Sequence, residues 1–191
     1  MSDATQTYMS DTIRRLSERF PIAESRDVRE DLAFVQIDPT HAVELITHLR
    51  DREGYTHLVF LTAVDYIEDG LFRLTYLLHN YARHVDLGVE VDIDRESARA
   101  ETIHHLWAQA ATYERELKEM FGIDFPGSPR VDEPFILESW PNEPPMRREF
   151  DTKAYSENTY FHRPAPRRGV LAQDADGSGS DDADGEDGGA Q

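Results

Sequence analysis

The chain has 191 residues, no cysteine, and 38 Asp and Glu against 20 Lys and Arg, which gives a formal net charge of -18. Without a thiol, it cannot ligate an iron–sulfur cluster through cysteine, form a disulfide or use a cysteine nucleophile. Its charge opposes nucleic-acid binding, which needs clustered Lys and Arg. No stretch approaches the roughly 20 apolar residues of a membrane span, and no basic-then-apolar signal pattern begins the chain. We therefore expect a cytoplasmic protein, or one peripheral to a membrane.

The first part of the chain alternates between helix and strand signals. Ser10 or Asp11 can cap an amphipathic helix that ends at Pro21. A short strand is predicted over residues 33–37. The Asp38-Pro39 pair then provides a cap and a first helical residue, so a second amphipathic helix is predicted after it.

Three strand signals follow. Residues 58–64 and 71–78 are apolar and β-prone, and Asp69-Gly70 between them is a strong tight-turn signal, which predicts a hairpin. Over residues 85–93, apolar residues alternate with acidic ones, so we expect one face of the sheet to meet water. The acidic positions of this strand are Asp86, Glu90, Asp92 and Asp94.

The next segments, 97–110 and 113–121, are predicted to be helical, and Gly122 stops the second of them. Helices flanking a run of antiparallel strands predict an α+β fold of two layers, with a mainly antiparallel or mixed sheet. The sequence length favours one hydrophobic core. We assign this domain to residues 1–145.

Two segments of contrasting charge follow the domain. Residues 146–170 are locally basic and aromatic and show neither a helical nor a strand period, so we expect an extended arm. Residues 171–191 contain seven acidic residues, no basic ones and almost no large apolar group. Such a composition cannot bury enough surface to fold alone, which predicts a disordered acidic tail.

No common catalytic motif is present: the chain has no glycine-rich nucleotide fingerprint, phosphate loop, Gly-x-Ser-x-Gly or His-Glu-x-x-His. A metal or hydrolase site could use His104, Glu114 and Glu116 as ligands or as acid and base. However, positions 114 and 116 lie about 200° apart around a helix, so the two carboxylates cannot converge on one ion. We therefore expect no catalytic, cofactor-binding or metal-binding residue on this chain.

The charges of the 113–121 helix leave two alternatives open. Glu114 with Lys118, and Arg115 with Glu119, have the i,i+4 spacing of solvated helical ion pairs. The same charges could instead pair with another protein of a complex. The stretch 140–150, rich in Pro, Trp and Arg, presents the same choice, and its composition favours an interface.

The sequence 113–127, YERELKEMFGIDFPG, followed by Trp140 and by PMRREFD at 145–151, resembles the 30-kilodalton (C-type) subunit family of respiratory complex I, the NADH-quinone oxidoreductase. The LTAVDY segment at 61–66 is also similar to that family, and the resemblance covers roughly residues 30–152. Glu119 stands where the family usually has Asp. The same module occurs in membrane-bound hydrogenases and formate hydrogenlyases.

The resemblance implies a non-catalytic scaffold in the peripheral arm of the complex, on the cytoplasmic side of the membrane, with the electron donor left open. It implies packing against the large (D-type) subunit that helps build the quinone pocket, and against the small (B-type) subunit that bears the terminal iron–sulfur cluster. Iron–sulfur clusters and quinone would then belong to those partners. The residues expected at the subunit interface are Glu114, Arg115, Glu116, Phe121, Gly122, Trp140, Arg147 and Arg148. We further expect Arg147 and Arg148 to form desolvated ion pairs with the large subunit.

Overall fold

The structure, a computed structural model, describes residues 2–138, 140 and 143–159. The chain divides into two compact units, Met1–Asp151 and Thr152–Gln191. The described helices and strands are α1 (Ser2–Arg19), β1 (Ile22–Arg29), β2 (Leu32–Ile37), α2 (Pro39–Asp51), β3 (His57–Tyr66), β4 (Leu71–Asn80), β5 (Val85–Asp94), α3 (Ala110–Phe121) and α4 (Thr152–Thr159).

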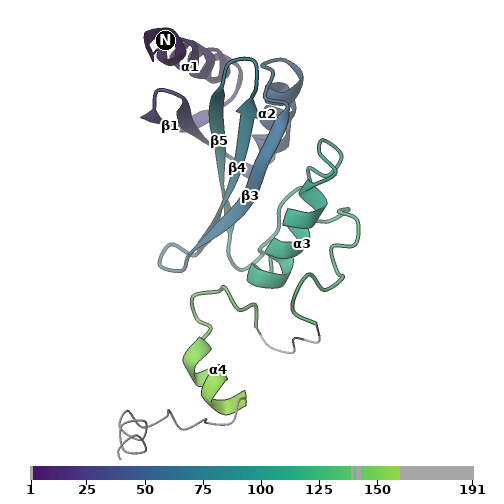
Figure 1. The fold of residues 1–191 in the computed structure, drawn as a ribbon. Helices are drawn as coiled ribbons and strands as arrows, with labels where there is room; N and C mark the ends of the chain where they lie inside the picture. Colours follow the sequence, from purple (N-terminus) through teal and green to yellow (C-terminus); the bar gives the residue numbers. More distant parts are fainter. Residues whose placement is uncertain (1, 139, 141–142, 160–191) are drawn as a thin grey trace, which may run out of the picture. The chain divides into compact units, whose positions relative to one another are not determined.

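The first unit is built on a five-stranded mixed sheet with the strand order β1-β2-β5-β4-β3 (Figure 1). The strands β3, β4 and β5 are successive antiparallel neighbours, and β2 pairs with β5 in parallel. Gly70 makes the tight turn of the predicted hairpin with a φ of 68°, a backbone conformation that favours glycine. The α+β prediction and the hairpin are therefore confirmed.

The hydrophobic core lies on one face of this sheet. Alternate residues of β4, namely Phe72, Leu74, Tyr76 and Leu78, are buried together with apolar side chains of α1, α2 and α3. Asp38 caps α2 as predicted, because its carboxylate accepts the Thr40 N–H at 2.9 Å. In the view of Figure 1, α3 lies beside β3, the edge strand that it contacts.

The other face of the sheet is more covered than its alternating pattern predicts. Glu90 is only 8% exposed, because Arg26 pairs with it at 2.5 Å from β1. Arg73 binds Asp92 through two nitrogens at 2.6 and 2.7 Å. Gly88 is buried beneath the Phe34 ring, where a β-carbon would come within 2.2 Å of that ring. The expectation that all these acidic side chains meet water is thus wrong for Glu90.

Three segments of the first unit differ from their predicted secondary structure. Helix α1 begins at Ser2, so Ser10 and Asp11 lie within the helix and do not cap it. Strand β1 was not predicted, because its polar sequence lacks an alternating apolar pattern and the strand lies at the sheet edge. Residues 97–109 form turns instead of a helix. Their hydrogen bonds run to other elements: the Trp107 ring N–H donates to the Thr56 carbonyl at 2.8 Å, and the Gln109 amide donates to the Leu58 carbonyl.

The second unit is described only over residues 152–159, which form α4, so this part of the arm is helical and not extended. Residues 146–151 belong to the first compact unit. The remainder of the predicted arm, 160–170, and the acidic tail, 171–191, lie outside the described residues. The division of the chain at residues 145 and 170 stays a prediction. In the described part of the chain, no helix is long and apolar enough to cross a membrane.

Candidate subunit-interface site

The site is organised by α3, which carries the Glu-Arg-Glu motif. Its buried face contains Leu117 and Phe121, and the ring of Phe121 meets that of Phe72 edge-on at 6.0 Å. Gly122 ends the helix with a φ of 75°, and its N–H donates to the last-turn carbonyls of Leu117 and Lys118. This left-handed cap ends the helix at the residue that the sequence predicts.

Glu114 points into the protein. Its side chain is fully buried, and its carboxylate accepts hydrogen bonds from the Thr102 hydroxyl at 2.7 Å and the Ile103 N–H at 2.8 Å. The solvated ion pair between Glu114 and Lys118, which the helical spacing allowed, is therefore not formed: Lys118 pairs with Asp124 and Asp132 instead. Glu114 instead fastens the irregular 97–109 segment to α3, because a buried carboxylate needs donors that replace water.

The sequence RREF at 147–150 docks onto the end of α3. The Met146 N–H donates to the Met120 carbonyl at 2.9 Å, and Arg147 Nε donates to the Phe121 carbonyl at 2.7 Å. The Arg147 guanidinium also lies over the Phe72 ring, 5.3 Å from its centre. A β-carbon on Gly122 would stand 3.1 Å from Arg147 Nη2, so the glycine is needed for this close approach as well as for the turn.

A buried ion pair secures the same segment from the sheet side. Arg95 Nε and Nη2 donate to the two oxygens of Asp65 at 2.7 and 3.1 Å, and the Arg148 N–H donates to Asp65 at 2.9 Å. Arg95 also pairs with Glu149. Burial alone would raise the pKa of Asp65, but the Arg95 hydrogen bonds, the Arg148 N–H and the neighbouring arginine charges outweigh it and lower that pKa. We call Asp65, Arg95, Arg147 and Glu149 the arginine clamp.

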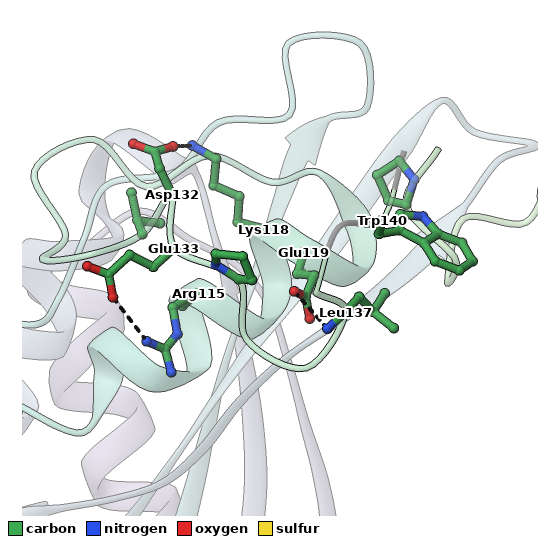
Figure 2. Close-up of a pocket in the computed structure, with 10 residues that line it drawn as sticks. Arg115, Lys118, Glu119, Asp132, Glu133, Leu137 and Trp140 are labelled. Atoms are coloured by element: carbon green, nitrogen blue, oxygen red, sulfur yellow. Dashed lines mark hydrogen bonds and ion pairs between the residues drawn. The ribbon is translucent and has the colours of Figure 1, made fainter. Parts of the chain in front are cut away.

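A groove of about 350 Å³ lies against α3 (Figure 2). Besides residues of α3, it is lined by Val131, Asp132, Glu133, Pro134, Leu137, Trp140 and Pro144. Glu119 holds one wall in place, because its carboxylate accepts the backbone N–H groups of residues 135, 136 and 137 at 2.7, 2.8 and 3.1 Å. Lys118 anchors the rim through Asp124, at 2.7 Å, and Asp132. The hydrogen bonds to Asp124 and Asp132 raise the pKa of Lys118.

The residues expected at an interface fall into two groups. Glu114 and Phe121 are buried in this chain, and Arg147 donates to the chain's own backbone. Arg115, Glu116 and Trp140 are half-buried, and Arg148 keeps 58% of its side chain exposed beside Glu68. Their contact with a partner stays a prediction, but the structure gives Arg147 an internal role that its sequence position does not reveal.

Asp65, Arg95 and Glu119 were not selected from the sequence as site residues. Asp65 lies within the LTAVDY segment, which was the available signal, whereas nothing in the sequence around Arg95 indicates its partner. Among the residues that the structure describes, no group of three or more His, Asp or Glu side chains could hold a metal ion.

Residues 35–156 match the family described as the respiratory-chain NADH dehydrogenase 30 Kd subunit, and the chain belongs to this family. The C subunit of NADH-quinone oxidoreductase from Moorella thermoacetica is 29% identical over 142 residues, covering 74% of this chain and 95% of that protein. The C/D subunit of NADH-quinone oxidoreductase from Acidiphilium cryptum is 31% identical over 171 residues, covering 84% of this chain but 28% of that longer protein.

Two solved structures share the fold. A chain of the membrane-bound sulfane sulfur reductase, an archaeal respiratory membrane complex, aligns with a TM-score of 0.75 and 25% identity, covering 83% of this chain and 96% of that chain. The trypsin-resistant fragment of Nqo5 aligns with a TM-score of 0.56 and 21% identity, covering 64% of this chain and 98% of that fragment. The match over residues 35–156 confirms the family suggested by the sequence motifs, and these two structures agree with its fold.

Proposed function

We propose that this chain is a non-catalytic scaffold subunit in the peripheral arm of a complex I-type NADH-quinone oxidoreductase. There it would support electron transfer to quinone coupled to ion translocation by keeping its partners at fixed positions. The observation that carries the proposal is the convergence of the family's separate motifs on one assembly. The 61–66 segment, α3 and residues 145–151 meet at the arginine clamp, where hydrogen bonds hold the three segments together.

The proposed partners are the large (D-type) subunit and the small iron–sulfur (B-type) subunit of the same complex. Support for the first comes from the relatives named as C/D subunits, in which a region similar to this chain forms about a quarter of one longer protein. Under this proposal the iron–sulfur clusters and the quinone belong to the partners. The chain would lie on the cytoplasmic side of the membrane, attached through those partners.

A second candidate is the equivalent subunit of a related membrane complex, such as a membrane-bound hydrogenase or formate hydrogenlyase. The alignment with a chain of the archaeal sulfane sulfur reductase complex favours this candidate, because it covers 83% of this chain. Both candidates assign the same scaffold role to the chain and differ in the electron donor and acceptor.

The test is purification of the tagged full-length chain from its own cells, followed by mass spectrometry of the proteins recovered with it and activity measurements. We expect the large and small subunits together with NADH-dependent quinone reduction. Recovery with hydrogenase or formate dehydrogenase subunits would select the second candidate. A chain recovered without any large-subunit homologue would refute the scaffold function.

A further inference from the structure

The groove beside α3 combines charged side chains of both signs with an apolar wall. Arg115 stands at one side of the groove, beside Glu133, and Leu137 and Trp140 line the other side (Figure 2). Ile136, next to Leu137 in the chain, leaves 65% of its surface exposed. A large apolar side chain in water, on a loop whose N–H groups are fixed by Glu119, is typical of a prepared protein–protein contact.

Arg115 is incompletely paired in this chain. Its Nε is buried without a hydrogen-bond partner, and its Nη1 lies 3.9 Å from Glu133, beyond hydrogen-bond distance. The guanidinium is nevertheless held in position, 5.3 Å from the centre of the Phe135 ring, with only 21% of the side chain exposed. A fixed, half-buried guanidinium with unused donors favours a carboxylate, which can accept two parallel hydrogen bonds from it.

We propose that this groove receives a segment of the large subunit that carries an acidic side chain next to an apolar one. The carboxylate would displace Glu133 and bind Arg115, and the apolar side chain would pack on Leu137 and Ile136. Glu133 can be displaced because it is 56% exposed and its contacts with Arg115 and Arg130 are both 3.9 Å long.

This inference rests on the proposed function, since it assumes that the large subunit is a partner. Its test uses the full-length chain expressed together with the full-length large subunit, and measures affinity after purification. Arg115→Gln should weaken binding at least about tenfold, or ~1.4 kcal/mol. Arg130→Gln is the matched control, because Arg130 makes the same 3.9 Å contact with Glu133 but is 71% exposed. It should bind within about twofold of the parent chain.

A second pair of variants guards against a folding defect at Arg115. Ile136→Asp changes an exposed side chain next to Leu137, so the fold is retained while a charge that repels a carboxylate is placed beside the groove. Val28→Asp, at a position 50% exposed on the edge strand β1, is its control. We expect Ile136→Asp to lower the affinity for the large subunit at least about tenfold and Val28→Asp to leave it nearly unchanged. Circular dichroism should show that both variants are folded.

The outcomes separate the two proposals. If the parent chain does not bind the large subunit, the proposed function fails. If the parent binds and both Arg115→Gln and Ile136→Asp bind equally well, the function stands and the groove inference is refuted. A photo-crosslinking residue at position 136 should attach to a large-subunit peptide that contains Asp or Glu. Attachment to a second copy, to residues 171–191 of the same chain, or to a peptide without an acidic residue would also refute the groove inference.

Discussion

The arginine clamp yields a sharp prediction for the variant Asp65→Asn. The side chain of Asp65 is 2% exposed and that of Arg95 is 17% exposed, so the charges are largely removed from water. The substitution keeps the size of the side chain but removes its charge and turns one acceptor oxygen into a donor. In either orientation of the amide, that donor would face an Arg95 N–H, and in one of them it would also face the Arg148 N–H.

The expected loss follows from these contacts. Removing one partner of a buried ion pair commonly costs about 3–5 kcal/mol of unfolding free energy. Here the loss should be smaller, about 2–3 kcal/mol, because Arg95 keeps Glu149 and one amide oxygen still accepts a hydrogen bond. For a compact unit of this size, that corresponds to a melting temperature lower by roughly 4–12 °C.

The measurement is urea unfolding of the full-length chain, monitored by circular dichroism, together with thermal melting. Glu68→Gln is the control, because it removes an exposed pair, 3.6 Å from Arg148 and 66% exposed, on the outer side of the same segment. It should cost no more than about 1 kcal/mol. If Asp65→Asn unfolds within about 0.5 kcal/mol of the parent chain, the clamp does not hold the 145–151 segment in the way described.

The same carboxylate makes the stability depend on pH. The pKa of Asp65 is lower in the folded chain than the unfolded value of about 3.9, so the unfolded chain binds the proton more readily. Its stabilisation is complete above roughly pH 4 and is lost as the pH falls through the folded pKa. The stability difference between the parent chain and Asp65→Asn should therefore be constant near neutral pH and shrink in acid.

Three further predictions concern the neighbouring elements. Gly122→Ala should destabilise more than Gly70→Ala in thermal melts, because both have a positive φ but only at Gly122 would a β-carbon meet other side chains at 3.1 Å. Each substitution carries a backbone cost of about 1–2 kcal/mol of stability. Equal losses of stability would show that the side chains packed on Gly122 can shift to accommodate a β-carbon. Glu119→Gln should accelerate hydrogen exchange at the amides of residues 135–137 by about tenfold or more, and unchanged exchange would remove Glu119 as the support of that loop. Truncation after residue 170 should leave the melting temperature and the recovery of partner subunits nearly unchanged, and a large loss of either would mean that the acidic tail binds a basic surface.

The sequence by itself determined the features that depend on neighbouring residues. The Asp38-Pro39 cap, the Asp69-Gly70 turn and the Gly122 stop each require a particular side chain or a positive φ at one position, so short patterns reveal them. The family also followed from residues close together, within the 113–127 and 145–151 segments. These local features were sufficient to predict an α+β fold with its β3-β4 hairpin.

Only the tertiary structure decided which charges are buried and what they bind. Asp65 meets the Arg148 N–H across 83 positions of sequence, and Arg95 meets Glu149 across 54. Most of the helix predicted at 97–110 is irregular in the structure, where Glu114 accepts the Ile103 N–H and the Thr56 carbonyl accepts the Trp107 ring N–H. Helical spacing places Glu114 beside Lys118, but packing against the sheet turns the carboxylate inward, since a buried charge is fixed by the donors around it and not by its neighbours in sequence.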